Sequence, residues 1–123
     1  MDQEQAARHH RDKANVVDLY EELTAGEGAG VIWTLKQGGD LNVNLVRFPV
    51  RGGVGEHINE EVDVLIVGVA GRGVATVDGQ EHRLRPGTVV FVPKGARRST
   101  RSNSDDFAYL TVHRRRGLLS PSS

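Results

Sequence analysis

From Gly30 onward, the chain consists of short runs of apolar or alternating residues, each bounded by glycine, proline, asparagine or aspartate. Runs of this kind with a period of two predict β-strands. Asp78-Gly79 lies between two of them, residues 74–77 and 80–84, and this dipeptide is the strongest short-range signal for a hairpin. We count seven or eight strands and at most one short helix. Closely spaced strands with such punctuation indicate a sandwich or a barrel.

The other segments set the expected limits of the domain. Residues 15–24 could form a short strand and a helical turn, and residues 94–106, KGARRSTRSNSDD, are expected to form a polar loop. Residues 1–13 carry almost no aliphatic side chains and predict a flexible tail. A second tail, rich in serine and proline, is expected at 117–123. One domain is therefore expected over residues 14–116.

Composition excludes several classes of function. The 123 residues suffice for one domain of ordinary size. Lysine plus arginine equals aspartate plus glutamate at 16 each, so bulk charge favours neither nucleic acid nor an acidic membrane as a partner. There is no cysteine, which excludes disulfides, zinc fingers and thiol nucleophiles. No apolar run approaches the roughly 20 residues of a membrane span, and no secretion signal is visible, so we expect a cytoplasmic protein.

Residues 87–98 read GTVVFVPKGARR, a glycine, an apolar run and a Pro-Lys-Gly turn, and this pattern resembles the second motif of the cupin superfamily. In that family a first motif, HxH, three or four residues, Glu, six residues and Gly, is followed by a second, Gly, five residues, PxG, two residues and His. Here Gly87 precedes five residues, a Pro-Lys-Gly turn at 93–95 and two more residues, so Arg98 stands where the family has its histidine. The resemblance covers roughly residues 41–113. It implies an all-β fold, a double-stranded β-helix or jelly-roll barrel of antiparallel strands.

The first motif, in GVGEHINEEVDVLIVGVAGRG, aligns in two ways. In one register, His57 takes the second histidine position and Glu61 the glutamate position, which leaves Gly55 in place of the first histidine. In the other, His57 and Asn59 take the two histidine positions and Asp63 stands for the glutamate. In this register Gly71-Arg72-Gly73 is the usual Gly-x-Gly turn, at the expense of one extra residue. We prefer the second register, because it also puts the Asp78-Gly79 hairpin at its usual distance.

The resemblance implies a metal-ligand set that is incomplete in both registers. Cupin metal sites use imidazole and carboxylate ligands that converge on one point. Here one histidine remains at most, and Arg98 has no lone pair to offer a metal. We therefore expect neither the standard catalytic metal nor another cofactor.

The remaining polar residues predict a ligand pocket. If residues 57–63 are extended, the side chains of His57, Asn59, Glu61 and Asp63 lie in one row on one face, which in a cupin is the barrel interior. Arg98 would face this row, either paired with Glu61 or Asp63 or binding a carboxylate or phosphate of a small molecule. Two simpler interpretations are a row that lies in solvent at the barrel rim and an arginine that belongs to a basic surface loop.

These observations favour a small cupin that binds a polar or anionic small molecule through His57, Asn59, Glu61, Asp63 and Arg98. One alternative is an enzyme, either a metal-free isomerase or lyase or a metal enzyme with a reduced ligand set. The other is a structural or interaction module whose barrel is filled. Fold analogy does not choose among them. Small cupins commonly pair through edge strands, so we also expect a homodimer, with residues 31–35 as a candidate interface.

Overall fold

The structure, a computed structural model, describes residues 14–115. Both predicted tails lie outside this range. The described residues form nine strands and one short helix, which confirms the all-β fold class. The elements are α2 (Leu19–Ala25), β1 (Gly30–Thr34), β2 (Leu41–Phe48), β3 (Gly53–Ile58), β4 (Val64–Ala70), β5 (Gly73–Val77), β6 (Gln80–Leu84), β7 (Val89–Val92), β8 (Arg97–Ser102) and β9 (Phe107–Arg114).

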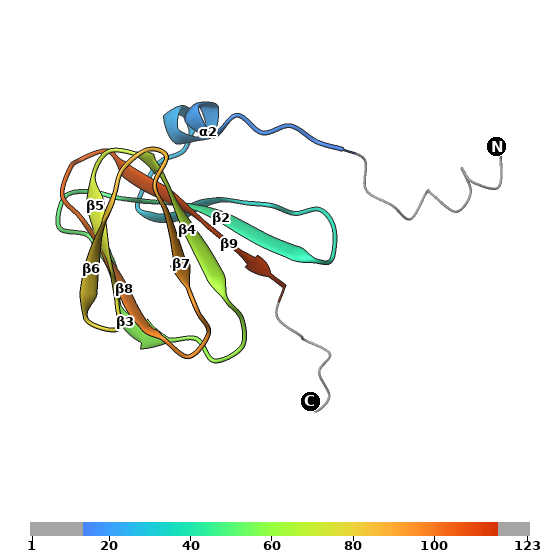
Figure 1. Cartoon of the computed structure of the whole chain (residues 1–123). Coiled ribbons are helices and arrows are strands. Elements are labelled where there is room, and N and C mark those ends of the chain that lie inside the picture. The colour runs from blue at the N-terminus through green and yellow to red at the C-terminus, as the bar shows by residue number, and fades with distance from the viewer. Residues whose placement is uncertain (1–13, 116–123) are drawn as a thin grey trace, which may run out of the picture.

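The strands form two sheets that face each other (Figure 1). The five-stranded sheet has the order β1-β2-β9-β4-β7, and the four-stranded sheet has the order β3-β8-β5-β6. Each strand pairing within residues 14–115 is antiparallel. This arrangement is the jelly-roll barrel that the sequence predicts.

The hydrophobic core lies between the two sheets. Its largest fully buried side chain is Phe107, whose ring centroid lies 5.3 Å from that of Tyr109. The other buried members of this cluster are Val46, Val62, Val64, Ile66, Ala75, Leu84, Val90, Val92 and Ala96. Since inward and outward residues alternate along a strand, the neighbours of these residues point away from the barrel.

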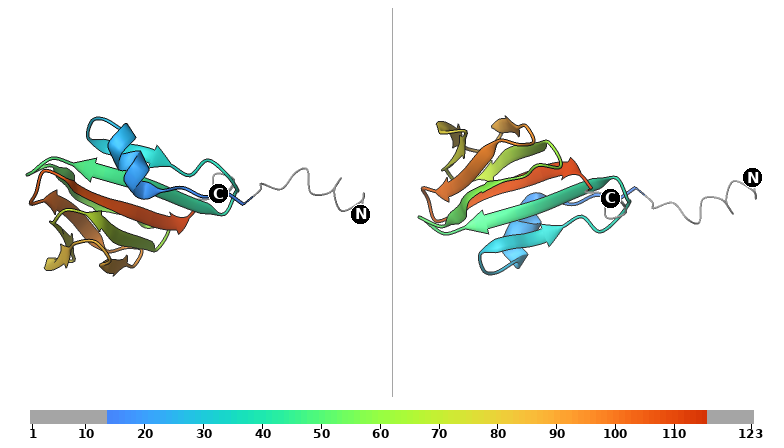
Figure 2. Two further views of the ribbon diagram at one scale, coloured as in Figure 1. Left: turned by 90° about the horizontal axis from the view of Figure 1, so that it is seen from above. Right: turned by 90° about the horizontal axis from the view of Figure 1, so that it is seen from below.

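The helix α2 packs on the opposite side of the five-stranded sheet from the four-stranded sheet (Figure 2). Leu19 and Leu23 of α2 contact a second apolar cluster there, which contains Leu45, Val69 and Ala108. The carboxylate of Asp18 accepts hydrogen bonds from the first backbone amides of the helix, and the helix ends at Gly26. The described residues contain no helix that is long and apolar enough to cross a membrane.

One local prediction at this end of the chain is wrong. The strand expected just before the helix is absent, because residues 14–18 pair with no sheet and lead directly into α2.

The turn between β5 and β6 confirms the predicted hairpin. Asp78 and Gly79 both have positive φ, 50° and 84°, as a two-residue hairpin loop of this type requires. The Asp78 carboxylate also accepts a hydrogen bond of 2.9 Å from the backbone amide of Arg97. The turn is thereby fixed to the start of β8.

The predicted polar loop at 94–106 instead contains a strand of six residues. Arg97–Ser102 forms β8, which pairs with β3 on one side and β5 on the other. The segment has no apolar periodicity, because the inward side chains of β8 are polar: Arg98, Thr100 and Ser102. β8 is held inside the sheet by its pairing with β3 and β5 rather than by an apolar pattern of its own.

Candidate functional site

A cavity of about 210 Å³ opens between the two sheets. Its deep end is apolar, since Val46, Ile66 and Tyr109 are buried, and its rim includes the exposed Val31 and Val54. The other lining residues are Gly30, Phe48, His57, Arg98, Ser99, Thr100 and Thr111. The cavity is thus an apolar pocket with one permanently charged side chain in its wall.

A β-bulge in β3 turns His57 toward this cavity. Val54 pairs with Thr100 and His57 pairs with Arg98, so three steps along β3 correspond to two along β8. An extra residue of this kind defines a bulge. Without it, residues 54 and 57 would point to opposite faces of the sheet. The bulge therefore allows both side chains to line the same cavity.

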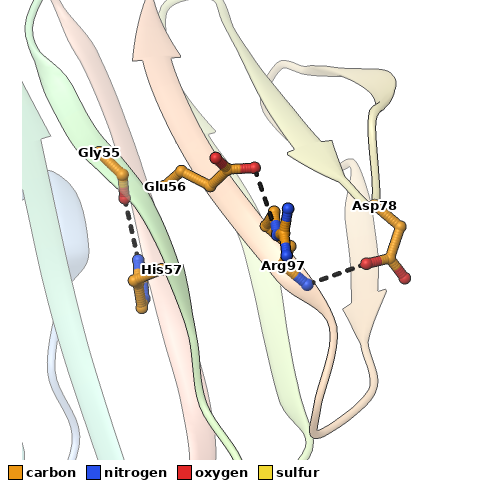
Figure 3. A network of polar contacts seen from close by, with 5 residues as sticks. All are labelled: Gly55, Glu56, His57, Asp78 and Arg97. Atoms are coloured by element: carbon orange, nitrogen blue, oxygen red, sulfur yellow. Dashed lines mark hydrogen bonds and ion pairs between the residues drawn. The ribbon is translucent and has the colours of Figure 1, made fainter.

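His57 and Arg98 form a hydrogen-bonded pair at the cavity wall. The Nε of Arg98 donates to Nε2 of His57 at 3.1 Å. Because arginine only donates, Nε2 of His57 must accept, and the ring proton must lie on Nδ1. Nδ1 then donates to the carbonyl oxygen of Gly55 at 3.0 Å (Figure 3). These two contacts hold His57 in one neutral tautomer and orient the Arg98 side chain.

The neighbouring residues of the pair point to the outer face of the sheet. Glu56 lies beside Arg97 there, with 3.7 Å between a carboxylate oxygen and Nε (Figure 3). Both side chains are more than half exposed, so this ion pair contributes little to stability. Arg97 is thus the surface arginine of this segment, and Arg98 is the arginine at the cavity.

Tyr109 forms the floor of the cavity beside Arg98. Its hydroxyl lies 2.9 Å from the hydroxyl of Thr100 in a hydrogen bond. Burial raises the pKa of the Tyr109 phenol above its ordinary value of about 10, against the smaller opposing effects of the Thr100 hydrogen bond and the positive charge of Arg98. The phenol therefore stays protonated at neutral pH.

The raised pKa of Tyr109 predicts that the free energy of unfolding falls in alkaline solution. Above about pH 10 the phenol of Tyr109 ionises in the unfolded chain, while in the folded chain it keeps its proton. The contribution to stability that is present below this pH is therefore lost as the pH rises toward the pKa of Tyr109 in the folded chain. Urea unfolding between pH 8 and pH 11 should show this decline, and Tyr109→Phe should reduce it. Equal declines in wild type and Tyr109→Phe would contradict the burial argument.

The structure does not bring all five predicted site residues together. His57 and Arg98 line the cavity, but β3 ends at Ile58, so the predicted row of His57, Asn59, Glu61 and Asp63 on one face is wrong.

The three other residues lie in the loop between β3 and β4. The side-chain oxygen of Asn59 accepts from the amide of Glu61 at 2.9 Å, and the Asp63 carboxylate accepts from the amide of Lys94, also at 2.9 Å. Glu61 is exposed, and its carbonyl oxygen accepts from the guanidinium of Arg114. The bonds of Asn59 and Asp63 hold the loop in shape.

Sequence reasoning missed the residues that make the rest of the cavity. Thr100 comes from the segment interpreted as a loop, and Tyr109 and Thr111 come from β9. The alternation in FAYLTVH could have identified the β9 pair, because Phe107, Tyr109 and Thr111 share one face of an extended strand.

The residues at the cavity do not fit the metal site that the cupin resemblance implies. A metal ligand needs a free lone pair, but Nε2 of His57 accepts from Arg98, and the guanidinium beside it would repel a dication. Within residues 14–115, no three side chains of histidine, cysteine, aspartate or glutamate lie close enough together to hold a metal ion.

Several solved structures share the fold of this chain. The chain resembles the BH2720 protein of Bacillus halodurans (TM-score 0.71, 18% identity, 85% of this chain and 83% of that one). It also resembles the TT1209 protein of Thermus thermophilus (TM-score 0.69, 22% identity, 82% and 97%). A third similar structure is KdgF of a Halomonas species (TM-score 0.65, 21% identity, 69% and 78%). At these identities the likeness concerns the fold.

No curated protein sequence matches the chain. The family model described as "Cupin domain" matches residues 44–113, which is more than half of the sequence. The chain therefore belongs to the cupin family.

Proposed function

We propose that this cupin binds a small anionic molecule in the cavity between its sheets, and that Arg98 holds the anionic group. The observation that carries the proposal is the position of Arg98. Its guanidinium is half-buried, lines the cavity and is oriented by its hydrogen bond to His57. A guanidinium has five N–H donors in a planar fork that matches the geometry of a carboxylate or phosphate.

The size and lining of the cavity narrow the ligand class. A volume of about 210 Å³ corresponds to about seven water-sized groups, at roughly 30 Å³ each. Apart from Arg98, His57 and the hydroxyl side chains, the wall is made of valine, isoleucine and aromatic side chains. A ligand with an apolar body and one anionic group matches both parts of this wall. Short-chain monocarboxylates have this chemistry.

The cavity also bears on the two alternative functions. An open pocket of this size favours ligand binding over a module with a filled barrel. Acid and base catalysis by His57 with a carboxylate is not favoured, because the described residues that line the cavity include no aspartate or glutamate. An enzymatic role stays a prediction, as does the homodimer.

Calorimetric titration with butanoate, a six-atom carboxylate, tests the proposal. Butanoate should bind more tightly than butanamide, which has the same shape and no charge. Arg98→Met keeps the length of the side chain and removes the charge. A hydrogen bond to a charged group is worth about 1.5–3 kcal/mol, so this substitution should weaken binding about ten- to hundredfold.

Arg97→Met is the matched control, because Arg97 lies on the outer face of the same strand. It should leave butanoate binding unchanged. Equal affinity of wild type and Arg98→Met for butanoate, or equal affinity for butanoate and butanamide, would contradict the proposal.

A further inference from the structure

A pocket of about 360 Å³ lies on the outer side of the four-stranded sheet, where β5 begins and β6 ends. Val74 of β5 pairs with Arg83 of β6, and both line this pocket. Each is followed in sequence by a buried core residue, Ala75 or Leu84, so their side chains point away from the core. Within residues 14–115 the pocket shares no lining residue with the cavity that contains Arg98, and we call it the outer arginine pocket.

Positive charge exceeds negative charge in the outer arginine pocket. Three arginines line it, Arg72, Arg83 and Arg85, against one acidic residue, Glu81. In the part of the chain that the structure describes, none of these four side chains forms an ion pair. The whole chain has equal numbers of acidic and basic residues, so the fold gathers this excess of positive charge locally.

The pairing of β5 with β6 brings the three arginines together. Gly73 pairs with Leu84, whose side chain is in the core, so the positions on either side of this pair face outward. The outward position on one side is Arg83. On the other side Arg72 precedes Gly73 and Arg85 follows Leu84, so these two arginines stand across from each other at the end of the ladder.

Backbone hydrogen bonds hold the segments that carry Arg72 and Arg85. The amide of Arg72 donates to Oγ of Ser104 at 2.9 Å, and its carbonyl oxygen accepts from the amide of Asn103 at 2.9 Å. The carbonyl oxygen of Arg85 accepts from the amide of Thr88, also at 2.9 Å. A ligand therefore has to order only the side chains, which keeps the entropic cost of binding low.

We propose that the outer arginine pocket binds a diphosphate group, either as the free ion or as part of a small molecule. Neighbouring like charges repel each other, and an anion with several charges offsets this repulsion. Guanidinium groups bind phosphate oxygens in a bidentate manner. A single carboxylate engages only some of the three arginines, whereas two linked phosphate groups offer acceptors to all of them.

The size and lining of the pocket support this ligand class. A volume of about 360 Å³ corresponds to about twelve water-sized groups, at roughly 30 Å³ each, which leaves room for two phosphate groups. The described residues that line the pocket include no aromatic side chain, so a nucleic-acid base would have no surface on which to stack. The phosphate groups, rather than a base, would therefore carry the recognition.

Calorimetric titration with inorganic diphosphate, in magnesium-free buffer of low ionic strength, tests the proposal. Wild type should bind diphosphate more tightly than orthophosphate. Arg72→Met and Arg83→Met should each weaken diphosphate binding about ten- to hundredfold, because each removes hydrogen bonds from a charged donor. Arg83→Lys should restore part of the affinity, since lysine keeps the charge without the planar fork. Glu81→Gln should tighten binding about threefold, because it removes a negative charge from the pocket.

Arg97→Met is the matched control, because Arg97 lies on the outer face of the same sheet, beside Glu56 and outside the pocket. It should leave diphosphate binding unchanged. The substituted side chains are exposed, so circular dichroism should show all variants folded. Adenosine diphosphate separates the two sources of the group. Binding that weakens in Arg83→Met supports an ester as the ligand, whereas binding of inorganic diphosphate alone supports the free ion.

The proposal would be overturned if wild type does not bind diphosphate at millimolar concentration. It would also be overturned if Arg97→Met weakens binding as much as Arg83→Met does, because general surface charge would then be responsible. Loss of diphosphate binding in Arg98→Met would overturn it as well, because diphosphate would then occupy the cavity between the sheets. The outcome is independent of the ligand proposed for that cavity, and Arg83→Met should bind butanoate as wild type does.

Discussion

Replacement of Phe107 by alanine is expected to lower the free energy of unfolding by about 3–5 kcal/mol. Phe107 is fully buried between the sheets, and its ring packs against that of Tyr109. Removing the ring loses its burial and leaves a void that the antiparallel sheets on either side cannot fill without moving. Since domains of this size are stable by only about 5–15 kcal/mol, the variant should lose a large share of its stability.

Urea unfolding of wild type and Phe107→Ala measures this loss directly. Ile58→Ala is a suitable control, because Ile58 is 44% exposed on β3 and should lose less than about 1 kcal/mol. A loss from Phe107→Ala as small as that of the control would mean that Phe107 is not at the centre of the core.

The second large effect is expected from Gly73→Ala, at the start of β5. A Cβ at this position would lie 2.3–2.6 Å from three ring carbons of Phe107. The ring is enclosed by the core and has no room to retreat, so we expect a loss of about 3 kcal/mol from overpacking. Gly39→Ala is the matched control, since a Cβ there meets nothing within 4 Å.

A double variant makes this prediction specific to the contact between residues 73 and 107. In a Phe107→Leu background the side chain is smaller, so the additional cost of Gly73→Ala should be lower than in wild type. Such non-additivity is expected of residues in direct contact. If the two losses simply add, the glycine is required for a reason other than the ring.

Most of the strands and turns can be predicted from the sequence, because they depend on local sequence signals. Asp78-Gly79 specifies its turn through backbone conformation alone, and the apolar runs of β4 and β7 specify buried strands through burial. β8 has neither signal. Its inward side chains line a polar part of the interior, so its sequence has the composition of a loop although it lies between two other strands.

The candidate site was predicted in part, for a similar reason. The motif at residues 87–98 located Arg98, because the spacing of glycines and prolines in that motif reflects the turns on either side of a strand. The prediction that Asn59, Glu61 and Asp63 share one face with His57 was wrong, because side chains alternate only as far as the strand continues. β3 ends at Ile58, and the Asn59 side chain then accepts a hydrogen bond from the amide of Glu61 in the loop. The bulge at Gly55 and Glu56 depends on pairing with β8, and its one local signal is Gly55, since a glycine inside a strand often marks a bulge.

We propose above that the cavity between the sheets takes a small anion through Arg98. A titration of isotope-labelled protein with butanoate, followed by amide NMR shifts, tests it most directly. We expect shifts of the amide signals of His57, Arg98, Thr100 and Thr111 in wild type and in Arg97→Met, and their loss in Arg98→Met. Shifts confined to the arginines of the outer face, or the same shifts in Arg98→Met, would contradict it.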